Sequence, residues 1–385
     1  MTTSSTRSAR CSEHRYALLL LSLLTIGAAE AAPHRDRNPL ASNGTVDDLP
    51  LASWVRLHVQ EDGDAVRFPR QAHAGAAFDT RRGRLVLFGS DTHGEDWTNA
   101  PLYFDPETRR WSRPYANDPP STYRVNAAGQ AVTGPADDPH PWAMHTYGLV
   151  AYDPGRDRLV VASTPEHLEP GRFTNALAEV WPKVQRHPTW LLDFASGRWQ
   201  PLAGDPIDLF PYAAAFDTNR GVLVGWRDDG VFELSFDPPR WQKRAGPGLT
   251  GYHNALVYDA RHEVVLMFGA SGGSDEVVVY DPRAASIRRQ PTPGIRPPQG
   301  EHVPLAFHPR LGRMVALLDH PRGRDTSAET WLYDYYQDAW EQVPSATLPF
   351  ALGMNYDLVY DPRHDALYLV TEGADAKTAV WALRL

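Results

Sequence analysis

Short apolar segments, each followed by a turn rich in Asp, Arg and Gly, recur along the chain between residues 51 and 385. The clearest unit has an apolar strand at 74–78, a turn at 79–83 and a second apolar strand at 84–89. A third strand at 102–104 leads through a second turn to Trp111. Such runs of β-branched, aliphatic and aromatic residues between turn residues are typical of β-strands. Each unit therefore predicts one sheet of four antiparallel strands.

The unit occurs six times along the chain. The first turn of each unit begins with a polar residue, and these residues are Asp79, Asp153, Asp217, Asp259, His308 and Asp361. The second turn is followed at a nearly constant distance by a large residue, in turn Trp111, Trp199, Trp241, Ile287 and Trp340. We interpret the turn aspartates and this outer series as structural, because both recur with the unit. The repeat predicts an all-β, six-bladed β-propeller of four-stranded blades.

The sixth unit lacks its outer strand. The chain ends with Val380–Leu385, which matches a third strand, whereas Ser53–Val59 matches an outer strand but precedes the first unit. We predict that this N-terminal strand, which includes Trp54, completes the C-terminal blade. Pairing of this kind leaves no open sheet edge in the ring.

The strand order and the spacing from aspartate to tryptophan resemble those of kelch repeats over about residues 51–385. The Gly-Gly pair usual in kelch units is reduced here to sequences such as Phe88-Gly89-Ser90. The resemblance implies a galactose-oxidase-like scaffold without the copper-radical site. That site needs a cysteine cross-linked to a tyrosine, and the single cysteine, Cys11, lies near the N-terminus.

The N-terminal segment has the pattern of a secretory signal peptide. Arg7, Arg10 and Arg15 precede an apolar run at 16–26 and small residues at 27–32. We predict a signal peptide at 1–32, a flexible linker at 33–50 and the propeller at 51–385, with export to the periplasm or outside the cell. The apolar run is shorter than the roughly 20 residues that a membrane-spanning helix needs, so we expect no membrane span.

Composition narrows the possible chemistry. Residues 1–32 hold three of the 38 basic and two of the 47 acidic residues, so their removal changes the formal charge from −9 to −10. An acidic surface without a Lys/Arg run repels phosphate backbones, which argues against nucleic-acid binding. Loss of Cys11 with the signal peptide excludes disulfides, thiolate nucleophiles and Cys-ligated metals.

Loop lengths predict which face of the propeller is functional. In kelch-like propellers, the loops joining strands one to two and three to four share one face, and here they are tight turns. The other loops hold all the long insertions, at 91–100, 116–142, 163–188, 291–300 and 319–328. Long loops occur mostly where they bind a ligand or a partner, so we expect this face to be the functional one. The alternative is that surface loops without a function have lengthened by evolutionary drift.

Histidine and tyrosine recur where the inner strands begin, near the predicted channel mouth. The candidate catalytic residues are His73, Tyr147, His253, His302 and Arg227. A His base and a Tyr acid, with Arg227, Arg172 or Lys183 neutralising a carboxylate, would suit a polysaccharide lyase or a sugar epimerase. The alternative is structural, since kelch-type repeats often place a histidine here as a bond between blades.

We predict neither a metal site nor a cofactor. The chain has no HExxH or comparable close pair, and the histidines come from separate blades. His140 and His145 are close in sequence, but they lie in a Pro-rich loop.

Four tryptophans fall outside the repeat, namely Trp97, Trp142, Trp181 and Trp226. We expect them to present exposed indoles to a sugar ring or a partner side chain. The predicted ligand-binding residues are Trp97, Trp142, His145, Arg172, Trp181, Lys183, Tyr212, Trp226, Tyr252 and Tyr356. They favour a monomeric module that binds a glycan or a protein on the long-loop face. The saccharide-active enzyme is the alternative function, and a structural role in an envelope assembly is a third.

Overall fold

The computed structural model describes residues 44–61, 64, 66, 68, 72–94, 96–204, 206–210, 213–248, 252–270, 275–319, 327–354, 356–372 and 377–385. The chain divides into two units, 1–37 and 38–385, and all described residues belong to the second. The predicted signal peptide and most of the predicted linker lie outside the described residues. Within the described part, no helix has the length and apolar character needed to cross a bilayer.

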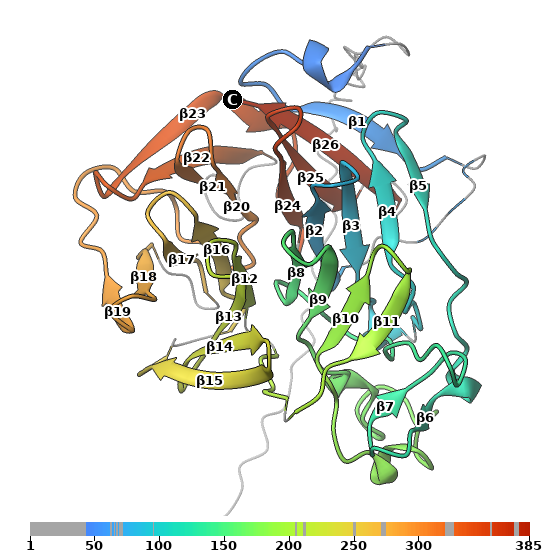
Figure 1. Ribbon diagram of the computed structural model, residues 1–385. Coiled ribbons are helices and arrows are strands. Elements are labelled where there is room, and N and C mark those ends of the chain that lie inside the picture. The colour runs from blue at the N-terminus through green and yellow to red at the C-terminus, as the bar shows by residue number, and fades with distance from the viewer. Residues whose placement is uncertain are drawn as a thin grey trace, which may run out of the picture. The chain divides into compact units, whose positions relative to one another are not determined.

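Six four-stranded antiparallel sheets form the blades (Figure 1), which confirms the predicted fold class. Blade one contains β2 (Gly75–Asp79), β3 (Arg84–Phe88), β4 (Leu102–Asp105) and β5 (Arg110–Ser112). Blade two contains β8 (Val150–Asp153), β9 (Arg158–Val161), β10 (Trp190–Asp193) and β11 (Arg198–Pro201). Blade three contains β12 (Ala213–Asp217), β13 (Val222–Arg227), β14 (Gly230–Phe236) and β15 (Pro239–Ala245).

The second half of the ring has the same order. Blade four contains β16 (Ala255–Asp259), β17 (Val264–Phe268), β18 (Val278–Asp281) and β19 (Ser286–Arg289). Blade five contains β20 (Leu305–His308), β21 (Arg313–Asp319), β22 (Ala328–Asp334) and β23 (Ala339–Leu348). Blade six contains β24 (Asp357–Asp361), β25 (Ala366–Glu372), β26 (Thr378–Arg384) and β1 (Val55–Val59). The inner strands β2, β8, β12, β16, β20 and β24 contact one another in sequence, and β24 contacts β2, which closes the ring.

The N-terminal strand completes the C-terminal blade, as the sequence predicts. β1 pairs antiparallel with β26, with Val55 opposite Ala382, and the two lie side by side in Figure 1. The Trp54 indole N–H donates a hydrogen bond of 3.0 Å to the Thr330 hydroxyl in blade five. Both ends of the propeller sequence are therefore held in one sheet.

The turn aspartates have the structural role expected of them. Asp79 is fully buried, accepts a hydrogen bond from the Arg82 backbone N–H at 3.1 Å and pairs with Arg84 at 3.0 Å. The Arg82 side chain also reaches Asp157 in blade two, with contacts of 2.8 and 2.9 Å. A turn in one blade thus binds the next blade.

The prediction of a flexible linker at 33–50 is wrong for residues 44–50, which are the described part of that segment. Val46 and Leu49 are buried in the hydrophobic cluster that also contains Leu57 and Val380, and a short 3₁₀ segment, η1 (Val46–Asp48), lies between Gly44 and β1. Burial of these two side chains removes apolar surface from water, which stabilises the segment against the propeller. The ordered propeller unit therefore begins before residue 51.

The long connections β5–β8 and β9–β10 of blades one and two fold into a small subdomain. It contains the hairpin β6 (Arg124–Val125) and β7 (Ala131–Val132), with η3 (Pro120–Thr122), η4 (Glu166–Leu168) and η5 (Trp181–Lys183). Its own core includes Tyr123, Trp142, Leu168 and Leu177. The insertions are therefore packed structure.

Candidate functional site

The long connections share one face because the strands of each blade alternate in direction. In blade one, the β3–β4 loop leaves the sheet at the same end as the connection from β5 to β8. This end, together with the β9–β10 loop and the other blade-to-blade connections, is called the long-loop face. Three groups of polar side chains lie on it.

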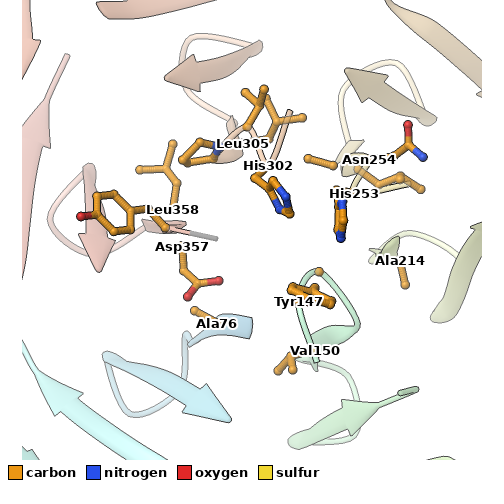
Figure 2. A pocket seen from close by; sticks show the side chains of 16 residues that line it. Ala76, Tyr147, Val150, Ala214, His253, Asn254, His302, Leu305, Asp357 and Leu358 are labelled. Carbon is orange, nitrogen blue, oxygen red and sulfur yellow. The ribbon is translucent and has the colours of Figure 1, made fainter. Parts of the chain in front are cut away.

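The first group lines the channel mouth, a cavity of about 140 Å³ (Figure 2). Tyr147, His253 and His302 lie close together, and Asp357 lies across from them. The His253 and His302 rings are 3.9 Å apart between centroids, and the Tyr147 ring lies 5.5 Å from His253 and 6.4 Å from His302. All three residues have positive φ angles of 43°, 55° and 52°, a conformation uncommon outside glycine.

Burial determines the charge of two members of this group, His253 and Tyr147. Desolvation, aided by the neighbouring His302, lowers the pKa of His253 to about 4, so its imidazole is neutral at pH 7. Desolvation likewise raises the pKa of the Tyr147 phenol above its ordinary value. At the channel mouth, His253 and Tyr147 are therefore neutral groups that can donate and accept hydrogen bonds.

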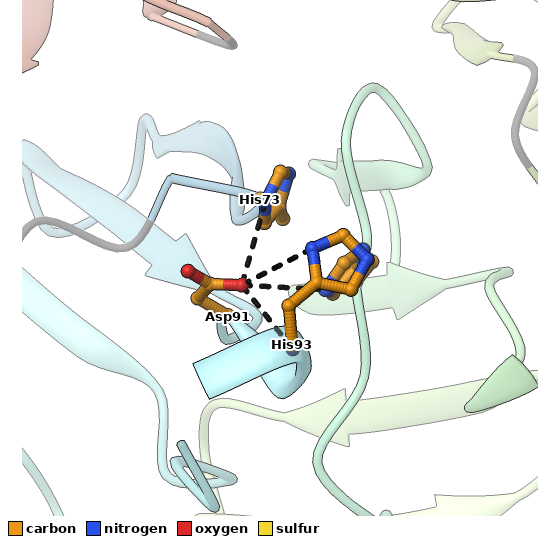
Figure 3. Close-up of side chains that lie close together, drawn as sticks. His73, Asp91 and His93 are labelled. Carbon is orange, nitrogen blue, oxygen red and sulfur yellow. Dashed lines mark hydrogen bonds and ion pairs between the residues drawn. The ribbon is translucent and has the colours of Figure 1, made fainter. Parts of the chain in front are cut away.

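The second group is the His/Asp cluster, formed by His73, Asp91, His93 and His145 (Figure 3). His73 precedes β2, Asp91 and His93 flank the start of η2 (Thr92–Gly94) in the β3–β4 loop, and His145 lies in the connection into blade two. One Asp91 oxygen, Oδ1, lies 3.5 Å from His73 Nε2, 3.6 Å from His93 Nδ1 and 3.8 Å from His145 Nε2.

Backbone hydrogen bonds fix the two buried members of the cluster. The N–H groups of Thr146 and Tyr147 both donate to the His73 carbonyl, at 2.8 and 3.2 Å, and the His73 and His145 rings stack at 4.1 Å. Gly89 allows this approach, because a Cβ at its φ of +127° would lie 2.5 Å from Thr146 Oγ1 and 2.8 Å from the backbone of Ala74. The connection into blade two is therefore held against the start of blade one.

Two imidazoles of this region, His145 and His167, are held neutral by a lowered pKa. Burial lowers the pKa of His145 far below its ordinary value, and the nearby His73, His167 and His93 lower it further. The same causes, burial first and then His93, lower the pKa of His167 to about 4. His167 contacts the rings of both His145 and His93, at 4.1 and 4.5 Å between centroids.

The third group forms the charged cleft, a pocket of about 480 Å³. Its lining residues are Glu166, His167, Arg172, Asp208, Phe210, Arg227, Asp228 and Tyr252. Arg172 pairs with Glu166, and Arg227 pairs with Asp229 at 2.5 Å and donates to the Asp208 carbonyl at 2.9 Å. Desolvation raises the pKa of the Asp208 carboxyl above its ordinary value. Because His167 lines the cleft and contacts the His/Asp cluster, the second and third groups adjoin.

The predicted site residues separate into these groups. Tyr147, His253, His302 and Tyr356 line the channel mouth; His73 and His145 belong to the His/Asp cluster; Arg172, Arg227 and Tyr252 line the charged cleft. Lys183 is exposed on η5, in none of these groups. Tyr212 lies outside the described residues.

The expectation of exposed indoles is wrong for two of the four tryptophans. Trp142 and Trp226 are 1% and 0% exposed, and the Trp142 indole N–H donates to the Val132 carbonyl at 2.9 Å. Trp97 and Trp181 are partly buried against the subdomain core. Trp97, Trp142 and Trp181 pack in the subdomain, because the insertions bury their own apolar residues. Trp226 belongs to β13 and is buried in the core between blades three and four.

Sequence reasoning missed Asp91, His93, Asp208 and Phe210. It also dismissed a metal site on the ground that the histidines come from separate blades, and that reason does not hold. His73 and His145 stand at the starts of neighbouring blades, so their side chains meet. The spacing Asp91-Thr92-His93, in a long loop of the same unit as His73, was the available signal.

The fold and the site define a six-bladed propeller with a histidine-rich, charged site on its long-loop face. No family model and no curated protein matches the sequence. TolB from Acinetobacter baumannii has a solved structure that matches this chain with a TM-score of 0.45 and 9% identity over 80% of this chain. This chain covers 63% of the length of that protein. The kelch-like resemblance remains a prediction from the repeat.

Proposed function

We propose that the chain is an exported propeller that binds a carbohydrate in the charged cleft of its long-loop face. The observation that carries the proposal is the lining of the cleft, in which carboxylates, guanidinium groups and aromatic rings surround one concave volume of about 480 Å³. Small-molecule sites in proteins typically occupy roughly 300–1,000 Å³.

Each lining group matches a part of a sugar. Glu166 and Asp228 can accept hydrogen bonds from ring hydroxyls, while the Arg172 and Arg227 guanidinium groups can donate to hydroxyl or ring oxygens. Tyr252 and Phe210 supply flat apolar surfaces for the C–H faces of the ring. This mixture suits a polar ligand with many hydroxyl groups.

A protein partner is the less favoured ligand. Protein-binding surfaces usually depend on clustered aromatic anchors such as tryptophan, but Trp142 and Trp226 are buried and Trp97 and Trp181 are occupied in packing. Export is supported by the arginines, apolar run and small residues at 1–32, which match a signal peptide.

Tyr252 offers a direct test of the cleft. It lines the cleft and is 52% exposed, whereas Tyr336, at the β22–β23 turn, is 86% exposed on the opposite face. We expect the wild-type chain to be stabilised thermally by members of a panel of neutral and acidic oligosaccharides. Tyr252→Ala should bind the best member at least about tenfold more weakly, because the stacking surface is lost, and Tyr336→Ala should bind it normally. Calorimetric titration measures both affinities. A panel without any binder, or equal losses in the two variants, would refute the proposal.

A second candidate function is a saccharide-active enzyme of the lyase or epimerase type. The observation in its favour is the grouping of Tyr147, His253 and His302 at the channel mouth, where a neutral imidazole can accept a proton and a phenol can donate one. Ultraviolet absorbance during incubation with acidic polysaccharides distinguishes the two functions. Growing absorbance from new double bonds indicates a lyase, and thermal stabilisation alone indicates binding.

A further inference from the structure

We propose that His73, Asp91, His93 and His145 bind one divalent transition-metal ion, with Zn²⁺ as the best match. Each residue offers one ligand atom, and these atoms all lie within 4.8 Å of one another. In Figure 3 the dashed lines from the histidines converge on the Asp91 carboxylate.

The spacing of the atoms suits coordination better than hydrogen bonding. The distances of 3.5, 3.6 and 3.8 Å from Asp91 Oδ1 to the imidazole nitrogens exceed the 2.7–2.9 Å usual for charge-assisted hydrogen bonds. Ligands bound tetrahedrally to zinc at about 2.0–2.1 Å lie about 3.3–3.4 Å from one another. A contraction of a few tenths of an ångström would bring these three contacts to the zinc geometry.

The buried His145 Nε2 is the strongest indication of a metal site. The side chain of this residue is fully buried, and its Nε2, which points toward the cluster, has no hydrogen-bond partner among the described residues. Buried polar nitrogens are rarely left without a partner in native proteins. An ion at the centre of the cluster would satisfy this nitrogen.

The other nitrogen of the His145 ring, Nδ1, already has a hydrogen-bond partner. The His145 Nδ1 lies 3.3 Å from the Tyr147 hydroxyl. With the proton on Nδ1, the ring donates to that hydroxyl and keeps the Nε2 lone pair for a metal, which is the usual outer-shell arrangement of a metal-bound histidine. Tyr147 would therefore orient His145.

The donor set selects the metal. Three imidazoles with one carboxylate suit zinc and similar first-row divalent ions, whereas Ca²⁺ and Mg²⁺ prefer oxygen ligands. The side chains of His93 and Asp91 are 36% and 39% exposed, so an ion can enter from the long-loop face. Because the ligands come from blade one and from the connection into blade two, a bound ion would also tie these two elements together.

The test is a titration of the purified full chain, stripped of metal with a chelator, with ZnCl₂. We expect one ion per chain and a higher melting temperature with zinc, and we expect bound Co²⁺ to show the visible absorption bands of a four-coordinate site. Asp91→Asn and His93→Ala, both at partly exposed loop positions, should weaken zinc binding at least about tenfold, in keeping with what the loss of even outer-shell partners costs.

His262→Ala is the matched control, since it removes an imidazole paired with Asp259 at the β16–β17 turn, outside the cluster. Its zinc affinity should equal that of the wild type. Absence of saturable zinc binding by the wild-type chain overturns the proposal, whether or not the variants fold. Unchanged affinity in both cluster variants, or an equal loss in His262→Ala, also overturns it.

Discussion

Leu57→Asp is expected to lower the free energy of unfolding by at least about 3 kcal/mol. Leu57 is 4% exposed in β1 and belongs to the cluster that contains Phe104, Val370 and Val380. The variant loses this apolar contact and places a carboxylate among apolar side chains. It also weakens the strand that joins the N-terminal segment to β26, so the ring of blades should open more readily.

Urea unfolding followed by tryptophan fluorescence measures this loss. Arg56→Ala is the matched control, because Arg56 is the neighbouring residue of the same strand, partly exposed and 6.0 Å from the Trp381 ring. Its loss should stay below about 1 kcal/mol, as for an exposed cation–π contact. Equal stability of the two variants would show that β1 does not close the propeller.

Asp79→Ala is expected to cost about 3–5 kcal/mol, the range for removing one partner of a buried ion pair. The buried Asp79 carboxylate binds the Arg82 and Arg84 side chains and the Arg82 backbone N–H. Without it, the guanidinium groups lose their buried partner and the Arg82 bridge to Asp157 loses its anchor.

Asp105→Ala separates this effect from the loss of a simple turn. Asp105 opens the second turn of the same blade and accepts hydrogen bonds from the backbone N–H groups of Glu107 and Thr108, at 2.9 and 3.0 Å, but it is exposed. We expect a loss of about 1 kcal/mol in the same urea titration, in line with an ordinary hydrogen-bonded position. If Asp79→Ala lost no more than Asp105→Ala, the turn aspartates would not be the links between blades.

The fold was predictable because its information is local and repeated. The turn aspartates and the outer tryptophans recur at fixed spacing, so the unit could be counted without knowing how the blades pack. Trp54 was assigned to the closing strand because the sixth unit lacked one. The packing of Val46 and Leu49 was missed because a short segment outside the repeat has no pattern to align.

The site was predictable only in part. The position at the start of each inner strand identified Tyr147, His253 and His302, which do meet at the channel mouth. Asp91 and His93 lie in the β3–β4 loop, outside the repeated unit, and their approach to His145 depends on the close packing allowed by Gly89. Contacts of this kind arise from tertiary packing, which spacing along the chain does not encode.

The tryptophans outside the repeat were poor markers of a ligand-binding surface for a related reason. Position outside the repeat was taken to mean exposure, but the insertions are long enough to build a core of their own, in which Trp142 contacts Tyr123 and Trp181. An aromatic residue in a long insertion is therefore weak evidence for a binding surface unless the insertion is known to lack a core.

Amide hydrogen exchange, with and without the saccharide that gives the largest thermal stabilisation, tests the central claim most directly. If the long-loop face holds the ligand, exchange should slow in the segments that line the charged cleft, at 164–173, 208–210 and 227–230, and stay unchanged in the tight turns at 79–83 and 105–110. Slower exchange in those turns, with the cleft segments unaffected, would place the ligand on the opposite face and contradict the account.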